Sequence, residues 1–154
     1  MRVGIISDTH GLLRPQAERA LRGADFIIHA GDVGDPEILT TLKLIAPVFA
    51  VRGNVDTAPW ARQLPLTTVV QAGGASFYVL HDLQGLDLRP DAAQFDFVIS
   101  GHTHKPEQSE RQGVRFLNPG SAGPRRFHLP ITLAIVDLAA QPWNAEFIEL
   151  LESA

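Results

Sequence analysis

The sequence contains no cysteine among its 154 residues. This absence excludes disulfide bonds, a thiolate nucleophile and a cysteine-liganded zinc site, and it is consistent with a reducing compartment. The sequence also has no apolar run near the roughly 20 residues that a membrane span requires, and its N-terminal apolar run before Ser7 is too short for a signal peptide. We therefore expect a cytoplasmic protein that does not associate with membranes.

Positive charge is scarce as well, because 13 Lys and Arg residues stand against 17 Asp and Glu residues, for a formal net charge of -4. An acidic chain without a Lys/Arg run lacks the electrostatic character of a general nucleic-acid binder. We therefore expect no large nucleic-acid partner. The hydrophobic fraction of 45% and the length are ordinary for a globular protein, and they predict a single domain over residues 1–154.

The first third of the sequence alternates short apolar runs with amphipathic segments. Strands are predicted at 2–7, 25–32 and 47–54, and helices at 14–23 and 36–46. A proline lies near the start of each predicted helix, where its fixed φ suits the first turn. This order predicts three parallel strands joined by right-handed crossovers.

The rest of the sequence is rich in β-forming residues. A hairpin is predicted around Gly73-Gly74, because β-rich runs flank this pair. Further strands are predicted at 96–100, 113–121, 131–138 and 145–151. The expected fold class is therefore α/β, with two packed sheets and helices on the outside, in four layers.

Side chains that can ligate metals follow five of the apolar runs, at the end where each predicted strand stops. They are Asp8, His10, Asp32, Asn54, His81, His102 and His104. Ligands bind at this edge of α/β sheets, and a glycine ahead of three of the groups lets the backbone turn sharply and approach a ligand closely. We therefore expect these side chains to meet at one site.

The set contains two carboxylates, four imidazoles and one amide. One tetrahedral ion uses about four ligands, so seven ligands suit two ions, especially if one carboxylate bridges them. Mixed imidazole and carboxylate sites accept Mn, Fe, Zn, Co or Ni. Two-metal sites with ions about 3.5–4 Å apart serve phosphoester hydrolysis, in which the metals generate a hydroxide and hold the phosphoryl oxygens.

Each of these motifs has an ordinary structural explanation when it is taken alone. The Gly31-Asp32 pair suits a turn, Asn54 suits a turn or a left-handed backbone conformation, and His81 suits a hydrogen-bonded histidine in the core. The occurrence of all five groups in order, each at a strand end, favours a metal site over independent turns.

The ordered motifs resemble those of the calcineurin-like metallophosphoesterases. They read Asp8-x-His10, Gly31-Asp32, Gly53-Asn54-x-Asp56, His81 and Gly101-His102-x-His104. The SDTHG sequence at 7–11 and the NPGS sequence at 118–121 are similar to the small bacterial and archaeal phosphodiesterase branch. The resemblance implies a four-layer α-β-β-α sandwich of two mixed sheets flanked by helices, with a dinuclear metal site.

The same resemblance implies a role for each ligand. The first metal would be held by Asp8, His10 and His104, the second by Asn54, His81 and His102, and both would be bridged by Asp32. Asn54, His102 and Asp32 are also the expected catalytic residues. The implied cofactors are two divalent ions, with Mn expected and Ni, Fe or Zn as alternatives.

The implied activity is hydrolysis of small phosphodiesters, with a metal-bridging hydroxide attacking phosphorus in line with the leaving oxygen. The alternatives are a phosphomonoesterase or nucleotidase, and a non-catalytic protein-binding scaffold such as the small retromer subunit, which has the same fold. The resemblance also suggests a homo-oligomer, either a dimer or a tetramer.

Two positions depart from the family pattern. Val55 stands where many members have a histidine that donates a proton to the leaving group or stabilises the transition state. This departure predicts a preference for good leaving groups, or a different acid. Asp82 stands where a glycine usually follows the histidine. It could orient a ligand, but a turn residue is the favoured interpretation.

Several further residues are assigned secondary roles. Asp56 either hydrogen-bonds a histidine ligand, holds its loop or caps a turn, and His29 is expected to hydrogen-bond the outer shell of the site. Asn118 and either Arg125 or Arg126 are candidate substrate contacts, because backbone N–H groups near Asn118 could face the metals and a guanidinium fits a phosphate. The alternative for the arginines is a solvated surface loop.

Overall fold

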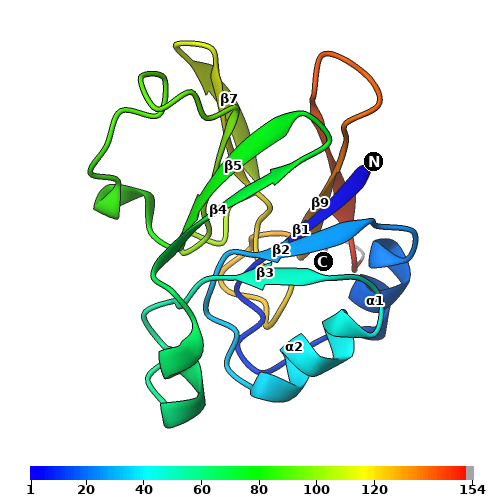
Figure 1. Ribbon diagram of the computed structural model, residues 1–154. Coiled ribbons are helices and arrows are strands. Elements are labelled where there is room, and N and C mark those ends of the chain that lie inside the picture. Colours follow the sequence, from blue (N-terminus) through cyan, green and yellow to red (C-terminus); the bar gives the residue numbers. More distant parts are fainter. Residues whose placement is uncertain (152–154) are drawn as a thin grey trace.

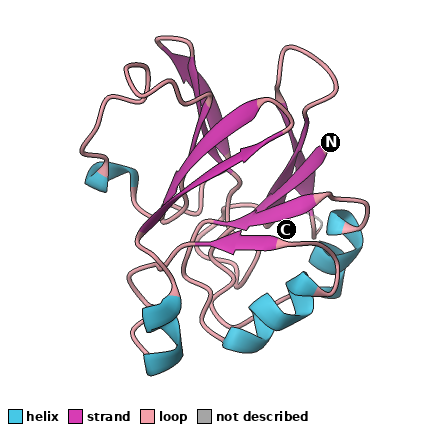
Figure 2. Cartoon of the chain, viewed as in Figure 1, coloured by secondary structure: helices cyan, strands magenta, loops and turns pink. Residues whose placement is uncertain are grey.

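The computed structural model describes residues 1–151, so the last three residues of the domain expected over 1–154 lie outside this description. Two five-stranded sheets pack face to face (Figure 1). Figure 2 shows that the longer helices gather on the outer side of one sheet, whereas loops surround the other.

The first sheet has the strand order β10-β9-β1-β2-β3. Its members are β1 (Arg2–Ile6), β2 (Phe26–His29), β3 (Val48–Ala50), β9 (Thr132–Asp137) and β10 (Ala145–Glu149). β1, β2 and β3 pair in parallel, with Ile5 opposite Ile28 and Ile28 opposite Phe49. β9 runs antiparallel to both β1 and β10. The predicted parallel order of the first three strands is confirmed.

Two helices, α1 (Pro15–Leu21) and α2 (Pro36–Lys43), cover the outer face of this sheet. Asp35 begins α2, because its side chain accepts a hydrogen bond from the N–H of Glu37 at 2.9 Å. Leu42 and the other apolar residues of the two helices form one buried cluster with the sheet. Both helices lie within the ranges that the sequence predicts.

The second sheet has the strand order β4-β5-β6-β8-β7. Its members are β4 (Thr67–Ala72), β5 (Ala75–Leu80), β6 (Phe97–Ile99), β7 (Glu107–Arg111) and β8 (Val114–Asn118). β5, β6 and β8 pair in parallel, and the edge strands β4 and β7 are antiparallel to their neighbours. The predicted hairpin at Gly73-Gly74 is confirmed as the turn between β4 and β5.

The inner faces of the two sheets enclose the main core. Phe77 and Phe97 of the second sheet stack with ring centroids 4.7 Å apart, and Phe26 of the first sheet meets Phe77 edge-on at 6.1 Å. These contacts fix one sheet against the other. The loops that leave the two sheets are therefore held in a fixed relative position.

The outer face of the second sheet is covered by residues 83–95, a loop that contains the short 3-10 helix η2 (Leu83–Gly85). Tyr78 and Val98 of the sheet are buried under this loop. The predicted α/β sandwich of two mixed sheets is confirmed, and its fourth layer consists of a loop with one helical turn.

The sequence does not predict β7. All five of its side chains are exposed, so the segment has no alternation of apolar and polar residues. It forms a strand because β8 offers an edge to pair with. The 3-10 helix η1 (Pro59–Gln63), between β3 and β4, is likewise not predicted. Within residues 1–151, none of the helices combines the length and apolar character of a membrane span.

Candidate metal centre

The carboxyl ends of strands from both sheets meet at one place. In the loops that follow them, the N–H of Asp8 donates to the carbonyl of Gly31 at 3.0 Å, and the N–H of Gly101 donates to the carbonyl of His81 at 2.9 Å. The N–H of His102 donates to Oδ2 of Asp8 at 3.1 Å, which joins the loop after β6 to the loop after β1. These contacts bring six Asp and His side chains into two adjacent groups.

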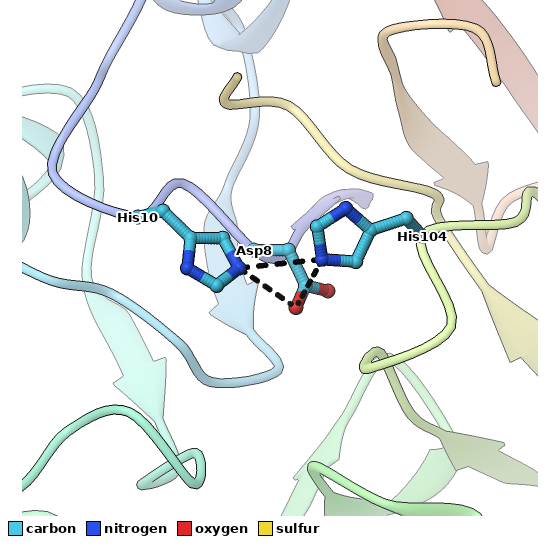
Figure 3. Close-up of side chains that lie close together, drawn as sticks. All are labelled: Asp8, His10 and His104. Carbon is cyan, nitrogen blue, oxygen red and sulfur yellow. Dashed lines mark hydrogen bonds and ion pairs between the residues drawn. The ribbon is translucent and has the colours of Figure 1, made fainter. Parts of the chain in front are cut away.

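The first group consists of Asp8, His10 and His104. Figure 3 shows both imidazole rings turned toward the Asp8 carboxylate. Oδ1 of Asp8 lies 3.6 Å from Nε2 of His10 and 3.4 Å from Nε2 of His104, and the two Nε2 atoms are 3.3 Å apart. Three potential ligand atoms thus form a nearly equilateral triangle.

The spacing of this triangle fits a metal ion. Ligand atoms about 2.1 Å from one ion lie about 3.0 Å apart at right angles and about 3.4 Å apart at tetrahedral angles. Oδ2 of Asp8 already accepts hydrogen bonds from Ser7 Oγ at 2.7 Å and from the His102 N–H. Oδ1 is buried and has no hydrogen-bond partner among the described residues. The arrangement leaves this oxygen available to a cation.

The second group consists of Asp32, His81 and His102. Nδ1 of His81 lies 2.7 Å from the carbonyl of Ala30 and must donate to it, which leaves Nε2 of a neutral ring as an acceptor. Nε2 faces Oδ2 of Asp32 at 3.1 Å, and within residues 1–151 it has no hydrogen-bond partner. Two acceptor atoms that face each other in a buried place call for a cation between them.

Asp32 lies between the two groups. Its Oδ2 is 3.1 Å from Nε2 of His81 and 3.5 Å from Nε2 of His10. Its Oδ1 accepts a hydrogen bond from the N–H of Val55 at 3.0 Å. Asp32 is the only carboxylate of the second group. Because its Oδ2 faces a histidine of each group, it connects the two groups.

The electrostatics of the first group favour an ionised Asp8. Burial of the carboxylate opposes ionisation, but the adjacent imidazoles of His10 and His104 and the hydrogen bond from Ser7 outweigh this and hold the pKa of Asp8 well below its usual value. Asp8 is therefore negatively charged throughout the neutral pH range, although it is completely buried.

The second group has the same character. Burial raises the pKa of Asp32, but the contact with His81 and the N–H of Val55 outweigh it, and the net shift is downward. Burial lowers the pKa of His81, but the contact with Asp32 and the charge of Asp8 outweigh it, and the net shift is upward. Both shifts favour the charged forms, because the ring of His81 and the carboxylate of Asp32 face each other.

The backbone is strained at five of the six residues in these groups. Eight non-glycine residues of the described chain have positive φ angles, and five of them are Asp8, His10, Asp32, His102 and His104, with φ between 46° and 73°. Such residues cost roughly 1–3 kcal/mol each and cluster at functional sites. Packing of the two sheets must supply this free energy, which fits a site that is built to hold a ligand.

Two of the motif glycines act differently from the expectation that they turn the backbone. Gly53 and Gly101 are not among the positive-φ residues. A Cβ at Gly53 would overlap the carboxylate of Asp32, and a Cβ at Gly101 would overlap the hydroxyl of Ser7 and come within 2.6 Å of Oδ2 of Asp8. These glycines therefore provide space for the carboxylates, while the ligand residues themselves make the turns.

Asp56 holds two loops together. Its buried carboxylate accepts hydrogen bonds from the N–H groups of Gly53, Gly34 and Val33 at 2.9, 3.0 and 3.2 Å. Of the alternatives left open by the sequence, the structure supports the one in which Asp56 fixes its loop. The carboxylate keeps the loop after β3 against the segment that carries Asp32.

His29 is buried and belongs to neither ligand group. Nδ1 of His29 accepts a hydrogen bond from the N–H of Gly31 at 3.1 Å, so Nε2 of the neutral ring donates to Oγ1 of Thr9 at 3.0 Å. The Thr9 hydroxyl in turn donates to the carbonyl of Val33 at 2.8 Å. Burial lowers the pKa of His29 to about 4, so the ring is neutral at pH 7.

The open side of the site carries the remaining expected ligands. Asn54 is exposed in the turn that also presents the N–H of Val55 to Asp32, so its ligand role stays a prediction. The side chain of His102 is 42% exposed, and its Nε2 lies 3.8 Å from Oδ2 of Asp82. Asp82 also caps η2 by accepting the N–H of Gln84 at 3.0 Å. It therefore acts as a turn residue that also faces His102.

The NPGS segment supports the site from behind. Nδ2 of Asn118 donates to the carbonyl of Gly101 and to Oγ1 of Thr103 at 2.9 and 3.0 Å, which fixes the loop that carries His102 and His104. The sequence reasoning missed Ser121, whose hydroxyl donates to the carbonyl of Asp8 at 3.0 Å.

The loop after NPGS carries the arginines considered as substrate contacts. The guanidinium of Arg125 donates to the carbonyl of Leu129 at 3.3 Å, and Arg126 is exposed. Contacts of Asn118 and the arginines with substrate stay predictions.

Comparison with known proteins places the chain in a family. The model of the calcineurin-like phosphoesterase superfamily domain matches residues 1–141. A probable metallophosphoesterase of Methanothermobacter thermautotrophicus is 33% identical over 96% of this chain and 92% of its own length. Phosphodiesterase YfcE of Escherichia coli K12 is 28% identical over 89% of this chain and 88% of its own length.

Similarity in structure extends further than similarity in sequence. Vps29 of Chaetomium thermophilum matches 96% of this chain and 93% of its own with a TM-score of 0.76, at 19% identity, which shows a common fold. The family match covers most of the sequence, including every residue of the two ligand groups. On these grounds the chain belongs to the calcineurin-like phosphoesterase superfamily.

Proposed function

We propose that the chain, as one domain, is a two-metal phosphodiesterase that hydrolyses small phosphodiesters. One observation carries the proposal: Oδ2 of Asp32 lies within 3.5 Å of a histidine from each of two adjacent ligand groups. Two ions that share one carboxylate are suited to phosphoester hydrolysis. The similarity to YfcE, which is named as a phosphodiesterase, supports the choice of diesters.

Each group would hold one divalent ion. Asp8, His10 and His104 would bind the first, and His81, His102 and the amide of Asn54 would bind the second, with Asp32 shared. When bound, the ions supply a nucleophile from water and offset the negative charge that develops on the phosphoryl oxygens. Imidazole and carboxylate ligands suit Mn, which we propose as the activating metal, with Ni, Fe or Zn as alternatives.

Burial divides the proposed ligands into a buried set and an exposed set. Asp8, Asp32, His81 and His104 are buried and keep their geometry without substrate. His102 and Asn54 lie on the exposed side, so they are the ligands that a substrate phosphoryl group meets first. We propose His102 and Asn54 as catalytic residues on this basis, and Asp32 because its Oδ2 faces a histidine of each ligand group.

The test uses protein stripped with a chelator and bis-p-nitrophenyl phosphate as substrate. We expect activity to return as Mn is added and to level off at about two ions per chain. Asp32→Asn should abolish activity, whereas Asp87→Asn, which makes the same change at an exposed position away from the site, should not. Activity that survives the chelator or Asp32→Asn would contradict the proposal.

Two other outcomes point to the alternatives. Faster hydrolysis of p-nitrophenyl phosphate than of the diester would indicate a phosphomonoesterase. Full uptake of metal without turnover of either ester would favour a protein-binding scaffold, in keeping with the fold that the chain shares with Vps29.

A further inference from the structure

A cavity of about 360 Å³ opens beside the metal centre, on the outer face of the second sheet. It lies between η2, the loop after β6 and the β7–β8 hairpin. The residues used below that line it are Asp82, His102, Glu107, Ser109, Arg111 and Phe116. Because His102 belongs both to this lining and to the second ligand group, the cavity continues directly from the metal centre.

The register of the hairpin gives the cavity its composition. Successive residues of a strand point to opposite faces, so Glu107, Ser109 and Arg111 of β7 share one face. Ser109 lies opposite Phe116 and Glu107 opposite Asn118, which places this row beside the aromatic ring. Gln108 and Glu110 point to the other face of the sheet. Neither of them lines the cavity beside the metal centre.

The cavity lining includes a cation–π pair. The guanidinium of Arg111 lies over the ring of Phe116, 4.7 Å from its centroid. Both arginine and aromatic side chains stack with planar rings of ligands. The pair therefore suits a planar group and does not select among rings by hydrogen bonds.

The rim carries two carboxylates, those of Asp82 and Glu107. Carboxylates accept hydrogen bonds from ligand hydroxyls, as in the binding of ribose hydroxyls by acidic residues. They also repel further phosphates, so a nucleoside diphosphate or triphosphate is disfavoured here. The rim therefore suits a substituent that is uncharged and bears hydroxyl groups.

We propose that this cavity binds a nucleoside esterified to the phosphorus, with the base on the guanidinium of Arg111, which Phe116 supports from behind, and the ribose hydroxyls on Asp82 and Glu107. The proposal rests on the phosphodiesterase function proposed above and gives its substrate class. The volume is within the range of roughly 300–1,000 Å³ that small-molecule sites occupy. The enzyme would then accept nucleotide diesters with little preference among bases.

Three p-nitrophenyl phosphodiesters with the same leaving group test this proposal. Their second substituents are methyl, phenyl and uridine bound through its 5′ oxygen. In wild-type protein with Mn, kcat/KM should increase from methyl to phenyl to uridine. Arg111→Ala should reduce the phenyl and uridine values about tenfold relative to methyl, because one base stack is lost. Glu107→Gln should reduce the uridine value about tenfold relative to both others.

Glu110→Gln is the matched control, because it removes the same charge from the opposite face of the same strand. It should leave the ratios among the three esters unchanged. Equal effects of Arg111→Ala or Glu107→Gln on all three esters would overturn the proposal, as would an absence of any effect.

A binding measurement separates failure of this inference from failure of the proposed function. Chelator-stripped protein is titrated with uridine by calorimetry, which requires no turnover. We expect binding in the wild type, weakened about tenfold by Arg111→Ala and unchanged by Glu110→Gln. Loss of all hydrolysis with this binding intact would reject only the phosphodiesterase. Normal hydrolysis without uridine binding, or with equal binding by Arg111→Ala, would reject the nucleoside cavity.

Discussion

The N–H of Val55 donates a hydrogen bond of 3.0 Å to Oδ1 of Asp32. Because Oδ2 of the same carboxylate faces His81 at 3.1 Å, this bond orients Asp32 between the two ligand groups. Val55 itself is 43% exposed. Position 55 therefore acts on Asp32 through its backbone N–H, and the side chain of Val55 can be replaced without breaking the bond.

Replacement of Val55 by histidine should change the dependence on the leaving group. A histidine can protonate a departing aryloxide of high pKa, whereas valine cannot. p-Nitrophenolate has a low pKa and leaves without a proton. We expect kcat for aryl diesters of high leaving-group pKa to rise about tenfold or more in Val55→His, and kcat for bis-p-nitrophenyl phosphate to change little. The measurement is the slope of log kcat against leaving-group pKa. Val55→Gln is the control, and a uniform change across the series would refute the prediction.

The absence of a side chain at Gly53 should be essential for activity. Gly85 provides the control, because an alanine there should have little effect. A Cβ at Gly53 would overlap Asp32, but a Cβ at Gly85 meets nothing within 4 Å. A displacement of about 1 Å in a catalytic group can lower the rate about 100-fold. We therefore expect Gly53→Ala to lose at least that much activity, and Gly85→Ala to lose almost none. Steady-state kinetics with saturating Mn provide the measurement, and near-normal activity of Gly53→Ala would show that Asp32 can move freely.

His29 should make the protein sensitive to acid. Burial lowers its pKa to about 4 from an unfolded value of about 6.5. Below pH 6.5 the unfolded chain binds a proton at this histidine that the folded protein does not bind. The free energy of unfolding therefore decreases as the pH is lowered, by about 3 kcal/mol at pH 4. Urea unfolding should show a shallower fall for His29→Gln than for the wild type. Replacement of the exposed His128 by Gln should retain the wild-type slope. Parallel curves for all three proteins would contradict this assignment.

The fold was predictable where burial sets the pattern of residues. β2 is buried along its whole length and β1 from Val3 to Ile6, and a helical segment joins the two strands, so their apolar runs and the spacing between them indicate parallel strands. β7 has the opposite character. Its exposed residues form a strand only because β8 lies beside them, and no local pattern indicates this. The cavity beside the metal centre depends on that hairpin and could not be predicted either.

The candidate site likewise has features that the sequence predicts and features that it does not. The meeting of Asp8 with His104, 96 positions apart in sequence, follows from the order of strands and from the edge at which they end. The positive φ angles of the ligand residues do not follow, because non-glycine residues adopt them only when surrounding contacts impose them. The role of Asp56 also depends on distant partners, since two of its donors lie more than 20 residues away.

The two ligand groups should lose metal independently. His104 is buried, and its Nε2 lies 3.4 Å from Oδ1 of Asp8 in the first group, whereas His102 belongs to the second. Loss of a direct ligand should cost more than the 10- to 100-fold in affinity that outer-shell changes typically cost. We therefore expect His104→Ala and His102→Ala each to retain about one tightly bound Mn where the wild type binds about two.

Electron paramagnetic resonance distinguishes these states, because two Mn ions that share Asp32 couple magnetically and a single ion does not. The wild type should give a coupled spectrum, and each histidine variant an uncoupled one. His128→Ala removes an exposed histidine outside both groups and should keep the coupled spectrum. If His104→Ala and His102→Ala both bind no Mn, the groups form one cooperative site. If either still binds two ions tightly, the histidine in question is not a ligand.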